Sequence, residues 1–313
     1  MARTPLLAAL ALAGLTLSHG SAAQEGGPFT IAETGEAFDD LEDAVDAVGG
    51  GRGTIRIAAG RYRDCAVQEA GRIAFVAEAP GQAVFDGGMC EGKAILVLRG
   101  RSARVEGLVF TRMAVEDGNG AGIRIEQGDL LVSHSLFIDG QCGILSASDP
   151  DGTIVIERST FSGLGRHPDG DGAHSVYVGH YGALRVVSTR FERGTGGHYL
   201  KSRAPSVEVL DSSFDDSAGT DTNYLIDLPE GAGGRIAGNV FVHGPDKENY
   251  GTMIAVAAEQ RVNGSAGLLV EDNRAWLAPG FRWTTVFVGD WSGDRPTVRN
   301  NRLAGGIAAY ERR

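Results

Sequence analysis

The feature that most constrains this chain is a repeat with a period of roughly 25 residues. A six-residue motif starts with Val or Ile and ends with Phe, and successive final phenylalanines are 27, 24, 30, 23 and 27 residues apart. They are Phe110, Phe137, Phe161, Phe191, Phe214 and Phe241. Each repeat also carries a second short apolar segment, such as Val176–Val178. A unit this small cannot bury a core alone, so the repeats are expected to stack as a parallel β-helix.

The N-terminal part of the mature chain predicts one amphipathic helix. Phe38, Leu41, Val45 and Val48 fall on one helical face, and the glycine run that starts at Gly49 ends the pattern. A solenoid needs a cover over its first rung, because that rung exposes apolar side chains and an unpaired backbone edge. We therefore expect this helix to cap the β-helix.

The helix, the glycine run, the strand Thr54–Ile57 and the turn Gly60-Arg61-Tyr62 resemble the N-terminal entry of the pectate-lyase-like superfamily. The resemblance covers essentially the whole mature chain. It implies an all-β fold: a single-stranded right-handed parallel β-helix of about ten rungs with an N-terminal capping helix. That superfamily contains lyases, glycoside hydrolases, epimerases, esterases, phage tailspikes and non-catalytic proteins, so the fold alone does not select an activity.

The first residues predict export. Arg3 precedes the apolar run Leu6–Leu17, and Ser21-Ala22-Ala23 provides the small residues of a cleavage site. We interpret residues 1–23 as a signal peptide, residues 24–53 as the N-terminal segment with the capping helix, and residues 54–313 as the β-helix domain. No segment is long and apolar enough for a membrane span. The expected location is periplasmic or secreted.

The net charge argues against nucleic acid as the partner. Forty acidic residues against twenty-nine basic ones leave no net positive field for nucleic acid, so an extended polysaccharide is the expected partner.

Cys65 and Cys90 are 25 residues apart, about one solenoid turn, which predicts a disulfide in an oxidising compartment. Cys142 is interpreted as a buried small apolar residue.

Three consecutive repeats are rich in ionisable and aromatic side chains. Because side chains alternate along a strand and rungs lie about 4.8 Å apart, Tyr177, Lys201 and Asp227 are predicted to form one outward-facing vertical row. Arg203 is expected beside that row, with Tyr199 also facing outward. The three segments are His174–His180, His198–Arg203 and Asn223–Glu230.

This row suits β-elimination in a uronate-containing polysaccharide. Arg203 would neutralise the sugar carboxylate, and Lys201 would take the C5 proton. Tyr177 or His180 would protonate the departing oxygen. Lysine and arginine in these roles resemble the alginate lyase and chondroitinase B group of β-helix lyases. The residues expected to bind substrate around them are His174, His198, Tyr199, Tyr224, Asp227 and Glu230.

Two other functions stay open. A glycoside hydrolase would use Asp227 and Glu230, and Asp171 is a further candidate carboxylate. A non-catalytic glycan-binding or envelope β-helix would use the same row only to grip a chain, with Lys201 and Asp227 as a cross-rung ion pair.

No cofactor is expected. Calcium is the one ion that the acidic turns 149–152 and 167–172 could hold, although turn formation is the favoured interpretation of both. His174 and His198 occupy equivalent positions and are expected to stack, because no third metal ligand accompanies them.

Overall fold

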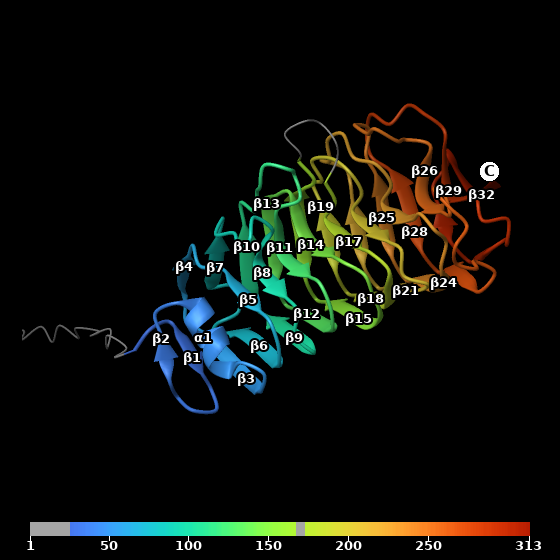
Figure 1. Cartoon of the computed structure of the whole chain (residues 1–313). Coiled ribbons are helices and arrows are strands. Elements are labelled where there is room, and N and C mark those ends of the chain that lie inside the picture. Colours follow the sequence, from blue (N-terminus) through green and yellow to red (C-terminus); the bar gives the residue numbers. More distant parts are fainter. Residues whose placement is uncertain (1–25, 167–172) are drawn as a thin grey trace, which may run out of the picture.

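Three parallel β-sheets running the length of the molecule form its walls in the computed structural model (Figure 1). The structure describes residues 26–166 and 173–313, so the predicted signal peptide lies outside the described residues. We name the walls sheets A, B and C, in the order in which each coil visits them.

The parallel strands of sheet A are β3 (Arg52–Ile57), β6 (Arg72–Ala77), β9 (Ser102–Glu106), β12 (Asp129–Ser133), β15 (Asp149–Glu157), β18 (Tyr181–Val187), β21 (Ser206–Leu210), β24 (Gly233–Ala237), β27 (Leu268–Glu271) and β30 (Thr297–Arg299). Sheet B consists of β4 (Gly60–Tyr62), β7 (Ala83–Asp86), β10 (Leu108–Thr111), β13 (Leu136–Gly140), β16 (Thr160–Leu164), β19 (Arg190–Glu192), β22 (Ser213–Asp215), β25 (Val240–His243), β28 (Arg274–Leu277) and β31 (Arg302–Leu303). Sheet C consists of β5 (Ala66–Gln68), β8 (Ala94–Leu98), β11 (Ala121–Ile125), β14 (Cys142–Ser146), β17 (Val176–Val178), β20 (Leu200–Ser202), β23 (Ile226–Leu228), β26 (Thr252–Val256), β29 (Thr285–Asp290) and β32 (Ile307–Arg312).

Each coil contributes one strand to each sheet, and each strand pairs in parallel with its counterpart in the next coil. Sheets B and C contain ten strands each, which matches the expected number of rungs. The predicted right-handed parallel β-helix is confirmed.

A short helix and two antiparallel strands cover the N-terminal end. α1 (Leu41–Val48) begins after Asp40, whose side chain accepts a hydrogen bond from the Glu42 N–H. Glu42 Oε2 in turn accepts the N–H of Val67 at 2.8 Å, which satisfies the free edge of the first strand of sheet C. On sheet A the edge is covered by β1 (Phe29–Ile31), which pairs with β3 and with β2 (Ala37–Phe38). Phe38 therefore belongs to a strand rather than to the predicted helix.

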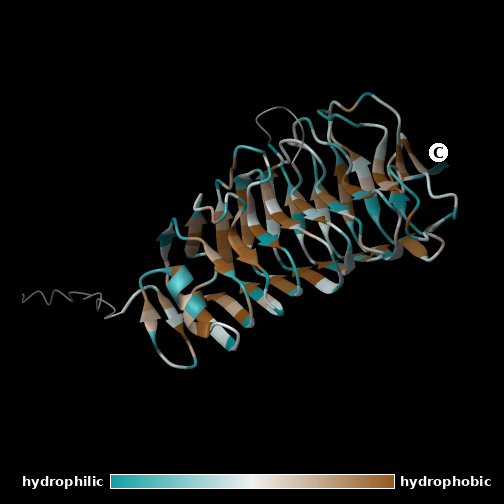
Figure 2. Ribbon diagram, viewed as in Figure 1, coloured by the Kyte–Doolittle hydropathy of each residue, from teal (hydrophilic) through white to brown (hydrophobic). Residues whose placement is uncertain are grey.

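A column of phenylalanines fills the lumen. The six phenylalanines of the sequence repeat are fully buried, and with Phe85 they stack with ring centroids 4.7 to 5.9 Å apart. Hydrophobic residues concentrate in the strands and hydrophilic residues in the turns (Figure 2). Each coil contributes one phenylalanine, and its ring stacks on the ring of the previous coil. The spacing of the repeat therefore predicts the residues of the core.

The tight turn between sheets A and B repeats one backbone device. A residue with positive φ, such as His134 (49°) or Asp211 (49°), is followed by a buried Ser, Thr or Asn. Near the C-terminus these polar residues form a ladder, in which Asn239 Nδ2 donates to Asn273 Oδ1 at 3.0 Å and Asn273 Nδ2 donates to Asn301 Oδ1 at 2.9 Å. The asparagine side chains also pair with backbone N–H and C=O groups at the turn, where the chain leaves the sheet and its backbone loses its strand partners.

The cysteines behave as predicted. Cys65 and Cys90 form a disulfide with a Cα–Cα distance of 5.5 Å. Cys142 is a buried free cysteine, and burial raises the pKa of its thiol to about 11, so it stays an inert thiol at neutral pH. Within the described ranges, no helix has the length and apolar character needed to cross a bilayer.

The phenylalanine column predicts the cost of removing one ring. Phe161→Ala deletes a fully buried ring between Phe137 and Phe191, and we expect it to lower the free energy of unfolding by about 3–5 kcal/mol. Thr160→Ala, on the partly exposed outer face of the same strand, serves as the control with an expected loss under about 1 kcal/mol. Urea denaturation of both variants checks this, and equal losses would contradict it.

Candidate functional site

The predicted row exists on the outer face of sheet C. Tyr177 in β17 pairs with Lys201 in β20, and Lys201 pairs with Asp227 in β23. The residues that precede them, Val176, Leu200 and Ile226, are fully buried in the lumen. The predicted alternation of inward and outward side chains along these three strands is therefore confirmed.

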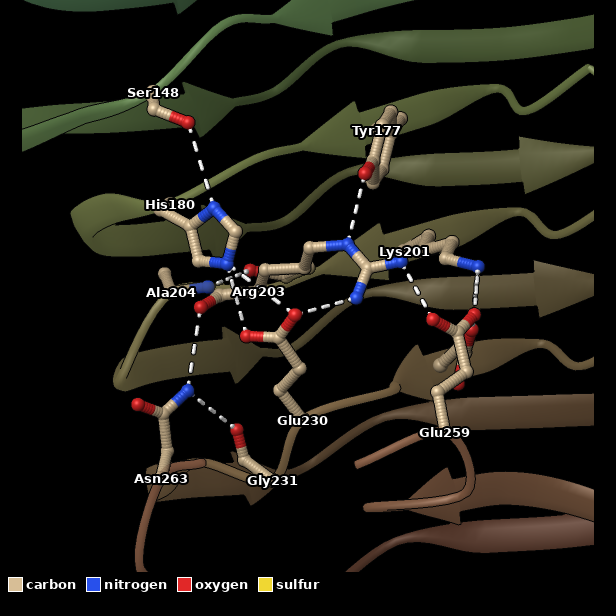
Figure 3. Close-up of polar contacts among 12 residues, drawn as sticks. Ser148, Tyr177, His180, Lys201, Arg203, Ala204, Glu230, Gly231, Glu259 and Asn263 are labelled. Carbon is tan, nitrogen blue, oxygen red and sulfur yellow. Dashed lines mark hydrogen bonds and ion pairs between the residues drawn. The ribbon is translucent and has the colours of Figure 1, made fainter. Parts of the chain in front are cut away.

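A second row follows the carboxyl ends of the same strands. His180, Arg203 and Glu230 lie in the turns that leave β17, β20 and β23. Figure 3 shows that Arg203 reaches Tyr177 of the first row, while Glu230 lies between Arg203 and His180. We call the two rows, together with Glu259, the sheet C cluster.

Arg203 connects the cluster. Its Nε donates to the Tyr177 hydroxyl at 2.9 Å, and its two terminal nitrogens reach Glu230 and Glu259 at 2.6 Å each (Figure 3). The planar guanidinium suits this three-way contact, because its donors point in fixed directions. Arg203 therefore sits where the prediction placed it, beside the row, and it already holds two carboxylates.

Lys201 is more enclosed than the sequence suggested. Only 8% of the residue is exposed, and its ammonium lies 2.6 Å from Glu259 Oε1 and 3.4 Å from Asp227 Oδ2. The outward-facing row is therefore largely closed to solvent at Lys201 and Asp227, whose side chains are 11% and 3% exposed, and the more exposed Glu259 side chain pairs with Lys201. Two carboxylates thus already pair with the ammonium group of the residue predicted to be the base.

Asp227 is a buried carboxyl group at the end of the row. Burial raises the pKa of its carboxyl group to about 6, although the neighbouring Lys201 acts in the opposite direction. Its Oδ1 is buried and has no hydrogen-bond partner among the described residues, whereas its Oδ2 lies 3.4 Å from both Lys201 Nζ and His198 Nε2. A carboxyl group that titrates near neutrality can give or take a proton at physiological pH.

His180 lies at the rim, with 55% of its side chain exposed. Its Nε2 is 3.0 Å from Glu230 Oε2, and its Nδ1 is 3.4 Å from the Ser148 hydroxyl. Glu230 is buried between His180 and Arg203. His180 is therefore accessible from solvent and oriented from both sides.

The expected histidine contact is confirmed. The rings of His174 and His198 lie edge to face with centroids 4.8 Å apart, and Tyr177 and Tyr224 extend this contact on either side. Burial lowers the pKa of His174 to about 3 and that of His198 well below its usual value. Both imidazoles are consequently neutral, and each contacts the row: His174 packs against Tyr177, and His198 lies beside Asp227.

Tyr199 does not face outward as expected. It is 1% exposed, and its hydroxyl donates to Asp216 Oδ1 at 2.8 Å beside the fully buried Lys247. The alternation fails here because Tyr199 precedes β20, where the incoming turn buries two consecutive residues, Tyr199 and Leu200. Tyr199 is thus a core residue beneath the site rather than part of its surface.

Sequence reasoning missed Glu259, which completes the cluster. It lies in the connection of residues 257–267 between β26 and β27, outside the repeated motif. Its contacts with Lys201 and Arg203 span more than fifty positions, so no short spacing could have indicated them.

Calcium binding by the acidic segments 149–152 and 167–172 stays a prediction. No group of three or more His, Cys, Asp or Glu side chains among the described residues could hold a metal ion. The prediction of a turn at residues 149–152 is wrong, because they begin strand β15 with an irregular register, and Asp149 Oδ2 accepts the Gly128 N–H at 2.6 Å. Asp171 and the turn 167–172 lie outside the described residues.

A pocket continues the site toward the N-terminal coils. It has a volume of about 350 Å³ and borders Tyr177 and Leu145. Leu145 pairs with Tyr177, and Arg124 pairs with Leu145, so the pocket follows the same row of sheet C. Polar side chains form its rim: Lys93, Asp117, Asn119 and Arg124.

Comparison with known proteins yields one similar solved structure. The pectin methylesterase from Aspergillus niger aligns with 86% of this chain and 88% of that chain, with a TM-score of 0.45 and 12% sequence identity. No protein-family model matches the sequence, and no curated protein matches it. The fold assignment rests on the three sheets of the chain itself.

The raised pKa of Asp227 predicts a pH-dependent stability. Its folded value of about 6 lies above the unfolded value of about 3.9, so its stabilising contribution is complete below about pH 4 and is lost as the pH rises through 6. The difference in unfolding free energy between the wild type and Asp227→Asn should fall by on the order of 2–3 kcal/mol between pH 4 and 7.

Denaturation at several pH values measures this difference. Asp211→Asn makes the same chemical change at an exposed turn and serves as the control. A constant difference for Asp227→Asn would show that this carboxyl group does not titrate in that range.

Proposed function

We propose that the protein binds an acidic, uronate-containing polysaccharide along the outer face of sheet C and cleaves it at the sheet C cluster. The observation that carries this proposal is the continuity of one row. The polar-rimmed pocket at Arg124 and Leu145 leads directly to Tyr177, Lys201 and Asp227. An extended ligand along the helix axis would contact both.

The composition of the pocket supports a sugar ligand. Leu145 and the Tyr177 ring offer apolar surface for the face of a sugar ring, and the rim offers donors and acceptors for its hydroxyl groups. Arg124 borders the pocket while its Nε lies 3.8 Å from Glu126 Oε1, so its guanidinium brings positive charge to the rim.

The favoured reaction is β-elimination, with roles adjusted to the contacts. Lys201 and Arg203 supply the positive charge that stabilises a uronate carboxylate as its C5 proton leaves. Asp227 accepts that proton, since its carboxyl group titrates near neutrality. The C4–oxygen bond breaks as the C4–C5 double bond forms, and the Tyr177 hydroxyl protonates the departing oxygen. Arg203 donates to that hydroxyl at 2.9 Å, so the Tyr177 proton itself remains free for transfer.

Hydrolysis is the second candidate, and one observation favours it. Asp227, with its raised pKa, and Glu230, paired with Arg203, are two carboxyl groups in different environments within one cluster. Glycoside hydrolysis needs such a pair, one protonated as the acid and the other ionised.

Export to the periplasm or beyond the cell belongs to the same proposal. The Cys65–Cys90 disulfide supports it, because disulfides persist in oxidising compartments. The signal-peptide pattern in residues 1–23 agrees with this location.

Activity assays on a panel of acidic polysaccharides test the proposed reaction. We expect the wild type to produce unsaturated uronates, detected by their ultraviolet absorbance. Asp227→Asn and Tyr177→Phe should each lower kcat by about 10²–10⁴-fold, as loss of a proton-transfer group does. Glu208→Gln, on the outer face of sheet A, is the control and should leave the rate unchanged.

The products decide between the candidates. New reducing ends without ultraviolet absorbance would support hydrolysis by Asp227 and Glu230, and binding without turnover would support a non-catalytic glycan-binding protein. Neither binding nor turnover on any acidic glycan would refute the proposed function.

A further inference from the structure

Glu259 is a third carboxylate on two cations that already have partners. Lys201 pairs with Asp227 at 3.4 Å, and Arg203 pairs with Glu230 at 2.6 Å. Glu259 adds one oxygen to each cation, both at 2.6 Å (Figure 3). One carboxylate shared between two cations in this way has the geometry of a bound anionic ligand.

Glu259 approaches the cluster from the solvent side. Its side chain is 42% exposed, whereas those of Lys201 and Arg203 are 11% and 16% exposed. It is carried by the connection between β26 and β27 and not by sheet C itself. An exposed ion pair contributes little to stability, so this contact can open at a smaller cost than the pairs beneath it.

The backbone around Glu259 is held without its side chain. The N–H groups of Glu259 and Gln260 donate to the Pro229 carbonyl at 3.0 and 2.9 Å, and those of Val262 and Asn263 donate to the Glu230 carbonyl. The Glu259 side chain can therefore leave the cations while its connection stays in place.

The charges also show an excess of acids. Among the described residues, Asp227, Glu230 and Glu259 form ion pairs with one lysine and one arginine, Lys201 and Arg203, and the histidines His180 and His198 lie beside Glu230 and Asp227. The two buried acids suffice to neutralise the cations, so Glu259 is the carboxylate that another carboxylate can replace without changing the charge of the site.

We propose that Glu259 is an internal occupant of a carboxylate-binding subsite formed by Lys201 and Arg203, and that the carboxylate of a uronate glycan displaces it. This inference rests on the proposed function and adds a source of selectivity. A neutral or esterified sugar brings no charge to replace that of Glu259, so only a sugar with a free carboxylate can open the subsite.

Binding measurements with two conservative variants test the displacement. Glu259→Gln keeps the shape of the side chain and removes its charge, so the wild-type penalty for displacing it disappears. We expect its Kd for uronate oligosaccharides to fall roughly tenfold, with little change for reduced, neutral versions of the same oligosaccharides. Gln260→Ala, at the exposed neighbouring position, is the control for disturbing the connection and should bind as the wild type does.

A second measurement uses the unaltered protein. If a glycan displaces Glu259, the carbon-13 NMR signal of the Glu259 side-chain carboxylate should move toward that of a solvated glutamate when saturating uronate oligosaccharide is added, while the backbone amides of residues 257–264 stay protected. This readout holds even if the Glu259→Gln variant fails to fold.

The outcomes separate this inference from the proposed function. Uronate binding by the wild type that is equal or weaker in Glu259→Gln, with an unchanged Glu259 carboxylate signal, would show that Glu259 is only a structural ion-pair partner, and the proposed function would survive. Absence of uronate binding in both proteins would overturn both proposals.

Discussion

In-register pairing between successive coils is the constraint on which everything else depends. It places residues about two dozen positions apart in sequence on neighbouring strands, so that Phe161 stacks on Phe191 inside and Tyr177 lies beside Lys201 outside. A slip of one residue would exchange the two faces of a strand. The column of rings opposes such a slip, because it would move a phenylalanine into solvent. The same packing that stabilises the solenoid therefore also fixes the register of its outer surface.

The sheet C cluster shows how a solenoid can hold charge at low exposure. Buried carboxylates are costly unless cations and hydrogen bonds compensate them. Here Arg203 contacts Glu230, Glu259 and the Tyr177 hydroxyl, and Lys201 holds Asp227. The compensation is incomplete at Asp227, whose Oδ1 lacks a partner among the described residues and whose pKa is raised by burial to about 6. That imbalance is what makes the cluster chemically distinctive on this surface.

Most of what the sequence predicted correctly follows from the repeat, with the capping helix as an addition. The phenylalanine column, the disulfide and the row from Tyr177 to Asp227 all follow from one period, because a regular coil converts spacing into position. Tyr199 was misplaced, since the alternation of a strand does not extend into the turn before it. Glu259 was missed for a related reason. Its connection is unique to one coil, and its contacts depend on a path that local pattern does not encode.

The disulfide has a consequence for how such a molecule comes apart. Cys65 and Cys90 lock two adjoining coils next to the helical cap, at the N-terminal end of the stack. In a one-dimensional array each coil depends mainly on its immediate neighbours. The array is thus clamped covalently at its beginning, while its last coils near β32 have no disulfide within the described residues. Local unfolding should therefore be directional. The C-terminal coils unfold first, and the two disulfide-linked coils stay folded as a template on which the other coils can refold.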